Sequence, residues 1–545
     1  MTRLRRWPVL IALVGLVLLA LLLNGLVSRQ PSIEVPDYGG VYTEAVVGRP
    51  RSLSPIFVQT DTEKDLAALL FRGLMRPDAT GVIVPDAAAR WEVSNDGLRY
   101  TFHLRDDVFW SDGVRVTAED VLFTIRCVQD PAYTANPGLA TFWQTVAMEA
   151  PDDQTVVFHL SEPFAPFLDQ TTLGLLPAHI LAQTPVADLA AAPFNLQPVS
   201  NGPFKLEKFE DTSVTLAPNP YDAGRRPYLA RLTFRFYPDR AQAIEAYVHK
   251  DVMGVGQVSP TDLVKVAEGA IYSASRPTFT VVYLNLDRFI FQDKRTRQAL
   301  LLALDRPALI RQALNGQALV ADSPILPQSW AAAGDLPRYP YQPEQARALL
   351  EQVGWKDTDG DGVRELGGQP FDFTLVTTDE PMRVAVAQLV AQQWATVGVR
   401  ARVQTVNARA LESVYFDTRL FDAALYGWST SDSDPDPYPF WHSTQVSEGK
   451  NIGGWANLDA DSRLERARQT PDPAARAQLY REFQSIFAEE VPALLLYHGV
   501  YHYAVDPQVH NVQVGQVMLD PSGRFQTVQQ WYLRTRMLRR GLLGS

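Results

Sequence analysis

The spacing of apolar residues predicts a chain that mixes helices and strands. Over 62–74 the leucines recur every three or four residues, which is the spacing of one buried helical face. Apolar and polar residues instead alternate over 99–105, and the turn signal Asn95-Asp96-Gly97 before them predicts a β-hairpin. Thr117 and Asp120 have the spacing of a capping box, so a further helix is expected to begin there.

The stretch 371–428 alternates strands with helices. The expected strands cover 371–376, 400–406 and 421–426, and the expected helices cover 382–397 and 410–418. Such βα units have parallel strands because their crossovers are right-handed, and open sheets of this kind bind ligands beyond the carboxyl ends of the strands. We therefore expect ligand contacts at Thr377, Thr378, Tyr426 and Trp428, which lie at or just before those ends.

The N-terminus combines basic residues with a long apolar run. Arg3, Arg5 and Arg6 precede the run over 7–27, which matches the roughly 20 residues that cross a bilayer and exceeds a signal-peptide core. An uncleaved transmembrane helix is therefore expected, and the positive-inside rule leaves the body outside the cytoplasm. A cleaved signal peptide is the alternative and implies the same compartment. A lipoprotein is excluded because no cysteine stands directly after the run to accept a lipid.

Composition narrows the possible partners. With 545 residues the chain exceeds one ordinary hydrophobic core, so several lobes are expected. The 50 Lys and Arg against 61 Asp and Glu give a net charge of -11, which disfavours nucleic acid. The single cysteine, Cys127, has no partner for an internal disulfide and lies in an apolar helical stretch, so we expect a buried and inert thiol.

Motifs of common hydrolases and redox enzymes are missing from the sequence. It contains no Gly-x-Ser-x-Gly, His-Glu-x-x-His or Cys-x-x-Cys, so we expect neither an enzyme nor a cofactor.

The segment 357–362 matches the first part of a calcium-binding loop in sequence. Asp357, Asp359 and Asp361 match its first positions, but Gly368 stands where the bidentate glutamate belongs and Glu365 occupies only position nine. A rigid Asp/Gly turn is the favoured interpretation, and weak calcium binding by the three aspartates stays open.

The loop after Trp428 is rich in carboxylates. It includes Ser431, Asp432, Asp434 and Asp436 beside the tryptophan ring, a combination that suits a cationic or α-amino group of a ligand. We take Ser431, Asp432 and Asp434 as candidate ligand contacts. The alternative is a solvated acidic turn.

Several motifs occur in a fixed order over about 39–531. They are found at 91–105, 110–113, 117–121, 201–204, 297–300, 304–306, 346–350, 354–355, 422–437 and 480–496. Together they resemble bacterial extracellular solute-binding protein family 5, the group that includes oligopeptide- and dipeptide-binding proteins of ABC importers.

The resemblance implies an α/β fold, a clamp of two lobes like that of periplasmic binding proteins, here preceded by the transmembrane helix. The expected division is 1–35 for anchor and linker, 36–283 for the first lobe with a strand-rich subdomain at about 85–200, 284–494 for the second lobe, and 495–545 for the return segment. The two hinge crossings are expected near Tyr283, Asn285 and Leu495. Hinge closure around the ligand would stabilise the closed form.

The resemblance also bears on ligand chemistry. Family members that bind peptides place an aspartate three residues after the tryptophan, where this chain has Ser431, with Asp432 one step later. Dipeptide binders hold the ligand carboxylate with an arginine before the long helix. This chain has no arginine at that place, the nearest being Arg383, so a partner for a free carboxylate is not evident. A longer peptide or another ligand is therefore favoured. In the first lobe the resemblance turns Phe57, Gln59 and Asn201 towards the cleft, although Phe57 is equally suited to the core.

The function implied by these features is the extracytoplasmic substrate-binding component of an ABC importer. Its expected partners are a peptide or similar small solute, the permease subunits, and the membrane through the N-terminal helix. We expect a monomer that does not bind nucleic acid. Two alternatives remain: a ligand-sensing receptor of the same fold, and a binder of a non-peptide solute such as a sugar or a metal chelate.

Overall fold

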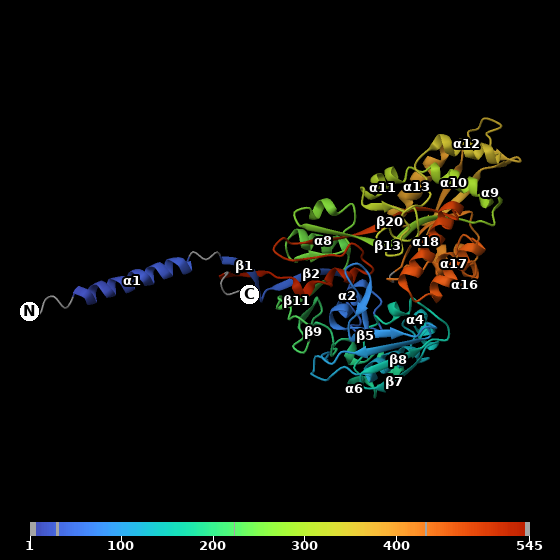
Figure 1. Cartoon of the computed structure of the whole chain (residues 1–545). Helices are drawn as coiled ribbons and strands as arrows, with labels where there is room; N and C mark the ends of the chain where they lie inside the picture. Colours follow the sequence, from blue (N-terminus) through green and yellow to red (C-terminus); the bar gives the residue numbers. More distant parts are fainter. Residues whose placement is uncertain (1–6, 29–31, 223, 431–432, 540–545) are drawn as a thin grey trace, which may run out of the picture.

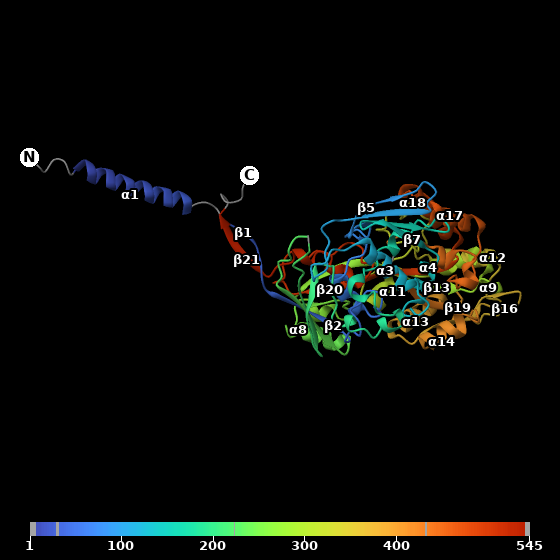
Figure 2. The same ribbon diagram turned by 90° about the horizontal axis from the view of Figure 1, so that it is seen from below.

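The computed structural model describes residues 7–28, 32–222, 224–430 and 433–539. The apolar run forms one helix, α1 (Trp7–Ser28), which lies apart from the rest of the protein in both views (Figures 1 and 2). Its described side chains, such as Trp7 and Ile11, are exposed. The chain is thus helical where a transmembrane segment was expected. Within the described residues, no helix has the length and hydropathy that a membrane span requires.

The segment that follows α1 is more ordered than expected. Strand β1 (Ser32–Asp37) pairs antiparallel with β21 (Arg534–Arg539) near the other end of the chain. Figure 2 shows the two strands side by side between α1 and the body of the protein. The linker expected up to residue 35 thus contains the start of a strand, which leaves no local signal because its partner lies about five hundred positions away in the sequence.

One 11-stranded sheet runs through the protein. Its order is β18-β17-β19-β13-β20-β12-β2-β11-β10-β9, and β14 pairs with β20. The strands are β2 (Val41–Val47), β9 (Phe204–Phe209), β10 (Ser213–Pro218), β11 (Arg231–Tyr237), β12 (Gly254–Val255), β13 (Ala270–Leu284), β14 (Ala318–Val320), β17 (Asp372–Thr378), β18 (Arg400–Val406), β19 (Ala423–Ser429) and β20 (Ala493–Val505). The long strands β13 and β20 pair antiparallel in its middle.

The protein also contains smaller sheets. A four-stranded sheet has the order β5 (Ala88–Val93), β6 (Arg99–Leu104), β8 (Thr155–His159) and β7 (Ala147–Asp152). Two short hairpins are formed by β3 (Met75–Pro77) with β4 (Ile83–Pro85) and by β15 (Glu365–Leu366) with β16 (Gln369–Pro370).

Helices cover the sheets. They are α2 (Asp61–Leu70), α3 (Ala118–Gln129), α4 (Pro137–Gln144), α5 (Phe167–Gln170), α6 (Ala178–Leu181), α7 (Val186–Leu189), α8 (Arg240–Val248), α9 (Phe289–Gln292), α10 (Lys294–Leu302), α11 (Arg306–Leu314), α12 (Pro343–Val353), α13 (Pro381–Ala395), α14 (Ala408–Ala410), α15 (Tyr438–Trp441), α16 (Gln445–Glu448), α17 (Leu458–Gln469) and α18 (Pro473–Glu490). Short 3₁₀ turns are η1 (Pro193–Asn195), η2 (Leu263–Val266), η4 (Pro521–Phe525) and η5 (Val528–Gln530), and η3 (Leu411–Phe416) is a π turn.

Local signals of the sequence agree with the structure where they are strong. The hairpin around Gly97 joins β5 to β6, and the backbone N–H of Thr117 donates to Asp120 Oδ2 at 2.9 Å, as a capping box requires. The π turn η3 replaces the helix expected over 410–418. Cys127 is buried, as predicted, and burial raises its pKa to about 12.

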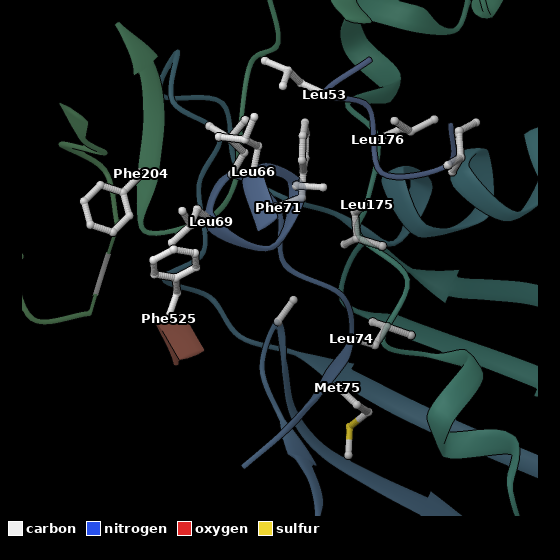
Figure 3. Close-up of a cluster of buried hydrophobic side chains, with 14 of the residues drawn as sticks. Leu53, Leu66, Leu69, Phe71, Leu74, Met75, Leu175, Leu176, Phe204 and Phe525 are labelled. Carbon is white, nitrogen blue, oxygen red and sulfur yellow. The ribbon is translucent and has the colours of Figure 1, made fainter. Parts of the chain in front are cut away.

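The first hydrophobic core surrounds α2. Figure 3 shows part of it, with Leu66 and Leu69 of α2 among Phe71, Phe204 and Phe525. The helix ends at Leu70 and not at residue 74, because the chain turns extended at Phe71 and the Leu70 carbonyl accepts the N–H of Gly202 at 2.8 Å. A tertiary contact has therefore overridden a helical pattern.

A second core lies around the other half of the sheet, in two layers. Val282, Leu284 and Leu494 join one cluster with α10, α11 and α13, while Val281, Tyr283 and Leu495 join the other with α17 and α18. This alternation is what a strand between two helical layers requires. β17 pairs parallel with both β18 and β19, which confirms the predicted βα units.

These cores define two lobes that share β13 and β20 (Figure 1). The residues expected at the hinge lie inside the second lobe. Tyr283 and Leu495 are buried in its core, and the Asn285 side chain donates to the carbonyls of Arg419 and Phe421 at 3.1 and 2.9 Å. The prediction placed them at the passage between lobes because the sequence does not show how far β13 and β20 extend.

Candidate functional site

The sheet topology brings two sets of strand ends face to face. β2 and β12 are parallel, and β12 runs antiparallel to β20 with Val255 opposite Ala504, so its carboxyl end points along β20 towards the second lobe. β19 runs antiparallel to β13 with Ser429 opposite Thr278, so the carboxyl ends of β19 and of its parallel neighbour β17 point towards the first lobe. Carboxyl ends of parallel strands are where open α/β sheets bind ligands. The space between the lobes is therefore the candidate site.

Aromatic rings line the second lobe at this edge. The rings of Tyr426 and Trp428 lie 5.0 Å apart, and both side chains are half-buried. Lys450 Nζ lies 4.6 Å from the Trp428 ring centroid, and the Arg383 guanidinium lies 4.5 Å from the Tyr426 ring centroid. The cation–π capacity predicted for a ligand is thus used, in this structure, by side chains of the protein.

The two threonines at the end of β17 are structural. Thr377 Oγ1 donates to the Leu425 carbonyl at 2.9 Å, and Thr378 Oγ1 accepts from Arg383 Nη1 at 3.3 Å. Both are buried. They join β17 to β19 and orient Arg383, and their burial leaves no hydroxyl surface for a ligand.

Asp434 is buried inside the second lobe. Its Oδ1 accepts from Tyr480 Oη at 2.7 Å, and its Oδ2 lies 3.0 Å from Arg476 Nε, so both carboxylate oxygens are engaged by α18. Burial raises the pKa of Asp434 to about 6, against the opposing charge of Arg476. The carboxylate expected to meet a ligand instead ties the acidic loop to α18. The other two candidates of this loop, Ser431 and Asp432, lie outside the described residues.

The same loop contacts the first lobe. Ser433 N–H donates to Asp169 Oδ1 at 2.6 Å, and Asp434 N–H donates to Asp169 Oδ2 at 3.3 Å. Ser433 Oγ also donates to the Gly81 carbonyl. A small cavity of about 30 Å³ lies beside these contacts, lined by residues of both lobes, among them Gly81, Pro277, Trp330, Ser433 and Leu519. Sequence patterns gave no indication of Asp169.

The candidates of the first lobe differ in accessibility. Gln59 is exposed, and its N–H donates to Glu63 Oε2 at 2.9 Å. Phe57 is half-buried against the first core, with its ring 6.0 Å from that of Tyr133. Asn201 is 1% exposed and accepts the Arg72 N–H at 2.9 Å, so its amide holds the end of α2 and does not reach solvent.

A further cavity opens at the carboxyl ends of β2 and β12. It has a volume of about 220 Å³ and is lined by Ala45, Val46, Val47, Asp61, Thr62, Asp65, Arg240, Gly256, Gln257, Tyr501 and Arg524. None of these residues was a candidate from the sequence, because they come from segments far apart in the chain and share no motif.

Behind this cavity lies a buried ionic cluster. Arg524 donates through Nη1 to Asp65 Oδ1 at 2.7 Å and through Nε to Glu44 Oε1 at 3.0 Å. Glu44 also accepts hydrogen bonds from Tyr42 and Tyr503. Burial raises the pKa of Asp65 to about 7, while the charge of Arg524 opposes the shift. Glu44, the second carboxylate on the same guanidinium, adds to the effect of burial and raises the pKa of Asp65 further.

The partial calcium loop forms an acidic group in the second lobe. One carboxylate oxygen from each of Asp357, Asp359, Asp361 and Glu365 lies within 4.8 Å of the others. Asp357 accepts the N–H groups of Gly360 and Gly362 at 2.7 and 3.1 Å, as a tight Asp/Gly turn does. Calcium binding there stays a prediction.

The fold is that of two-lobe periplasmic binding proteins. Residues 82–449 match bacterial extracellular solute-binding proteins, family 5, and the chain belongs to this family. The oligopeptide-binding protein AppA of Bacillus subtilis is 30% identical over 520 residues, covering 93% of this chain and 94% of that protein.

Solved structures agree along nearly the whole chain. The structure of Bacillus subtilis AppA in complex with a nonapeptide matches with a TM-score of 0.68 and 28% identity, covering 92% of this chain and 100% of that one. NikZ from Campylobacter jejuni in complex with Ni(L-His) matches with a TM-score of 0.71 and 27% identity, covering 90% and 99%.

Proposed function

We propose that this protein is the extracytoplasmic substrate-binding component of an ABC importer and captures a peptide between its lobes for delivery to permease subunits. The similarity to an oligopeptide-binding protein over 93% of the chain carries the proposal. The opposed strand ends between the lobes supply a place for the ligand. The protein acts by binding and closing, without catalysis.

A metal chelate is the second candidate, because NikZ is a structural neighbour in complex with Ni(L-His). The histidines of β20 do not favour it. His498 Nδ1 is 2.8 Å from the Thr278 carbonyl, His502 Nδ1 is 2.8 Å from Ser273 Oγ, and both side chains are buried within the sheet. A peptide is therefore preferred.

Of the residues that the sequence predicts as ligand contacts, we propose those with exposed side chains as the actual contacts. Trp428, Tyr426 and Gln59 are at least partly exposed. Ser431 and Asp432 follow Trp428 in the loop that meets the first lobe and remain proposed contacts. Asn201, Thr377, Thr378 and Asp434 serve to position the walls.

The hinge is proposed in the middle of the shared strands. The ladder between β13 and β20 is irregular between Ser275 and Phe279, opposite Val500 and His498. Missing ladder hydrogen bonds make a strand pair easier to bend. The first lobe is then the chain from about 36 to this point plus the return segment, and the second lobe lies between the two crossings.

Peptide capture is tested with a panel of peptides of two to nine residues that contain no Asp or Glu. Full-length protein in detergent should bind at least one of them in native mass spectrometry, and spin labels at Asp153→Cys and Leu420→Cys, both exposed, should report a new interlobe distance on binding. Binding should also raise the Tm. The buried Cys127 does not compete for label.

Trp428→Ala is the matched binding variant for that panel. Loss of a cleft aromatic should weaken binding by about 1–3 kcal/mol, whereas Tyr341→Ala, at an exposed position of the second lobe, should not. A panel without any bound peptide would refute peptide capture, and binding at an unchanged interlobe distance would refute closure.

We further propose that α1 anchors the protein to the outer face of the cell membrane. The proposal rests on the apolar sequence of α1 and the three arginines before it. The protein should fractionate with membranes and keep its N-terminus, and deletion of 2–28 should release it. A mature N-terminus at or after residue 29 would show that the segment is cleaved.

A further inference from the structure

The cavity at the carboxyl ends of β2 and β12 lies in the first-lobe wall of the cleft. Its position follows from the sheet, since Val47 and Asp61 lie just after β2 and Gly256 and Gln257 lie just after β12. A ligand held between the lobes would meet these residues directly. The cavity volume of about 220 Å³ admits part of a peptide.

Arg240 lines this cavity, and among the described residues no carboxylate lies close enough to form an ion pair with it, although Asp61 and Asp65 attract it from a longer distance. Nη1 donates to the Gly256 carbonyl at 2.7 Å and Nη2 donates to Gln257 Oε1 at 2.7 Å, and both acceptors are neutral. A guanidinium carries more N–H groups than these bonds use. Burial and the neighbouring charge of Arg524 lower the pKa of Arg240 more than Asp61 and Asp65 raise it, so an added anion would stabilise the charged guanidinium.

Tyr501 contributes a second donor. Its side chain is 2% exposed, and its hydroxyl has no hydrogen-bond partner among the described residues. A Cβ at Gly256 would lie 2.3 Å from this hydroxyl, so only glycine at this position leaves the hydroxyl in place. Buried hydroxyls are rarely left without a partner unless a ligand or water supplies one.

The acidic residues around the cavity are already bonded. Both oxygens of Asp65 accept from Arg524, at 2.7 and 2.5 Å, and Asp61 Oδ2 accepts from Gln257 Nε2 at 2.6 Å. Arg524 is likewise used by Asp65 and Glu44. Apart from the rim carboxylate of Asp61, the unused hydrogen-bonding capacity of the cavity is therefore that of donors, chiefly Arg240 and Tyr501.

From this geometry we propose that the cavity binds a carboxylate of the captured peptide, held by the Arg240 guanidinium and the Tyr501 hydroxyl. The inference rests on the proposed function and names the ligand group that the first lobe recognises. The cavity would provide, in the first lobe, a binding partner for the carboxylate of the ligand. Arg383, the arginine nearest to the expected place in the second lobe, lies instead against Tyr426 and Thr378.

The test compares the tightest-binding peptide of the Asp- and Glu-free panel as its free acid and as its C-terminal amide. Calorimetry on the full-length protein should show the acid binding about 10- to 100-fold more tightly, the range of one charge-assisted hydrogen-bonded pair. Arg240→Gln should remove this preference. Arg235→Gln, at an exposed arginine of the same lobe, should retain it.

Two further variants separate recognition from folding. Arg240→Lys keeps the charge and should keep part of the preference, and Tyr501→Phe should reduce it by about 2- to 10-fold. The variant Asp61→Asn tests whether the ligand group bound in the cavity is negatively or positively charged. Removal of this rim carboxylate should tighten binding of the free acid, whereas it would weaken binding of a ligand ammonium group.

The outcomes are distinct. Retained acid preference in Arg240→Gln, or equal binding of acid and amide by the unmutated protein, overturns the carboxylate site while peptide capture stands. No binding by any peptide overturns both. An amidated peptide with a single Glu that regains the Arg240-dependent affinity would assign the cavity to a side-chain carboxylate, and failure to regain it would assign the peptide C-terminus.

Discussion

Arg524→Met is expected to lower the free energy of unfolding by about 3–5 kcal/mol at pH 8. The substitution leaves the buried carboxylates of Glu44 and Asp65 without their cationic partner. The Arg524 side chain is 2% exposed and holds both Glu44 and Asp65. Thermal or urea unfolding monitored by circular dichroism measures the change. Arg463→Met, which breaks a half-exposed ion pair with Glu482, should cost less than about 1 kcal/mol.

The loss should depend on pH in a defined direction. The pKa of Asp65 is already raised to about 7 in the folded protein, against an unfolded value near 3.8. A raised carboxyl pKa contributes stability that is complete below the unfolded value and is lost as pH rises through the folded one. Without Arg524 this shift grows, so the variant should be closest to the unmutated protein near pH 4. An equal loss at pH 4 and pH 8 would contradict the ionic cluster.

Asp434→Ala should likewise destabilise the second lobe by about 3 kcal/mol at pH 8, because it leaves the buried Arg476 without its anion. Peptide affinity should fall with it, since the loop that meets Asp169 loses its attachment to α18. Unfolding curves and calorimetry measure the two effects.

A double variant distinguishes support from ligand contact. Asp434→Ala combined with Arg476→Met removes both charges and should recover part of the stability, as coupled neighbours do. Asp436→Ala, whose partner Arg468 is more exposed than Arg476, should cost less. Full stability in Asp434→Ala together with lost peptide binding would make Asp434 a ligand contact after all.

Local periodicity predicted much of the fold. The parallel βα units over 371–428 and the hairpin at Gly97 follow from side-chain spacing, which reflects which face of an element is buried. The motifs also led to the family and hence to two lobes. The sequence was a weaker guide to which polar residues contact the ligand. Asn201 and Asp434 stand where ligand contacts were expected, yet their side chains are taken by Arg72 and by Arg476 and Tyr480.

The order of residues was thus sufficient for the α/β class and the family, because these depend on nearest neighbours along the chain and on motifs of fixed spacing. The tertiary structure decided the rest. The length of β13 and β20, the pairing of β1 with β21 and the cavity of Arg240 and Tyr501 each join positions hundreds of residues apart. A polar side chain is available to a ligand only if no residue from a distant part of the chain already hydrogen-bonds to it. Buried polar groups nearly always have such a partner, and the sequence alone does not show which ones do.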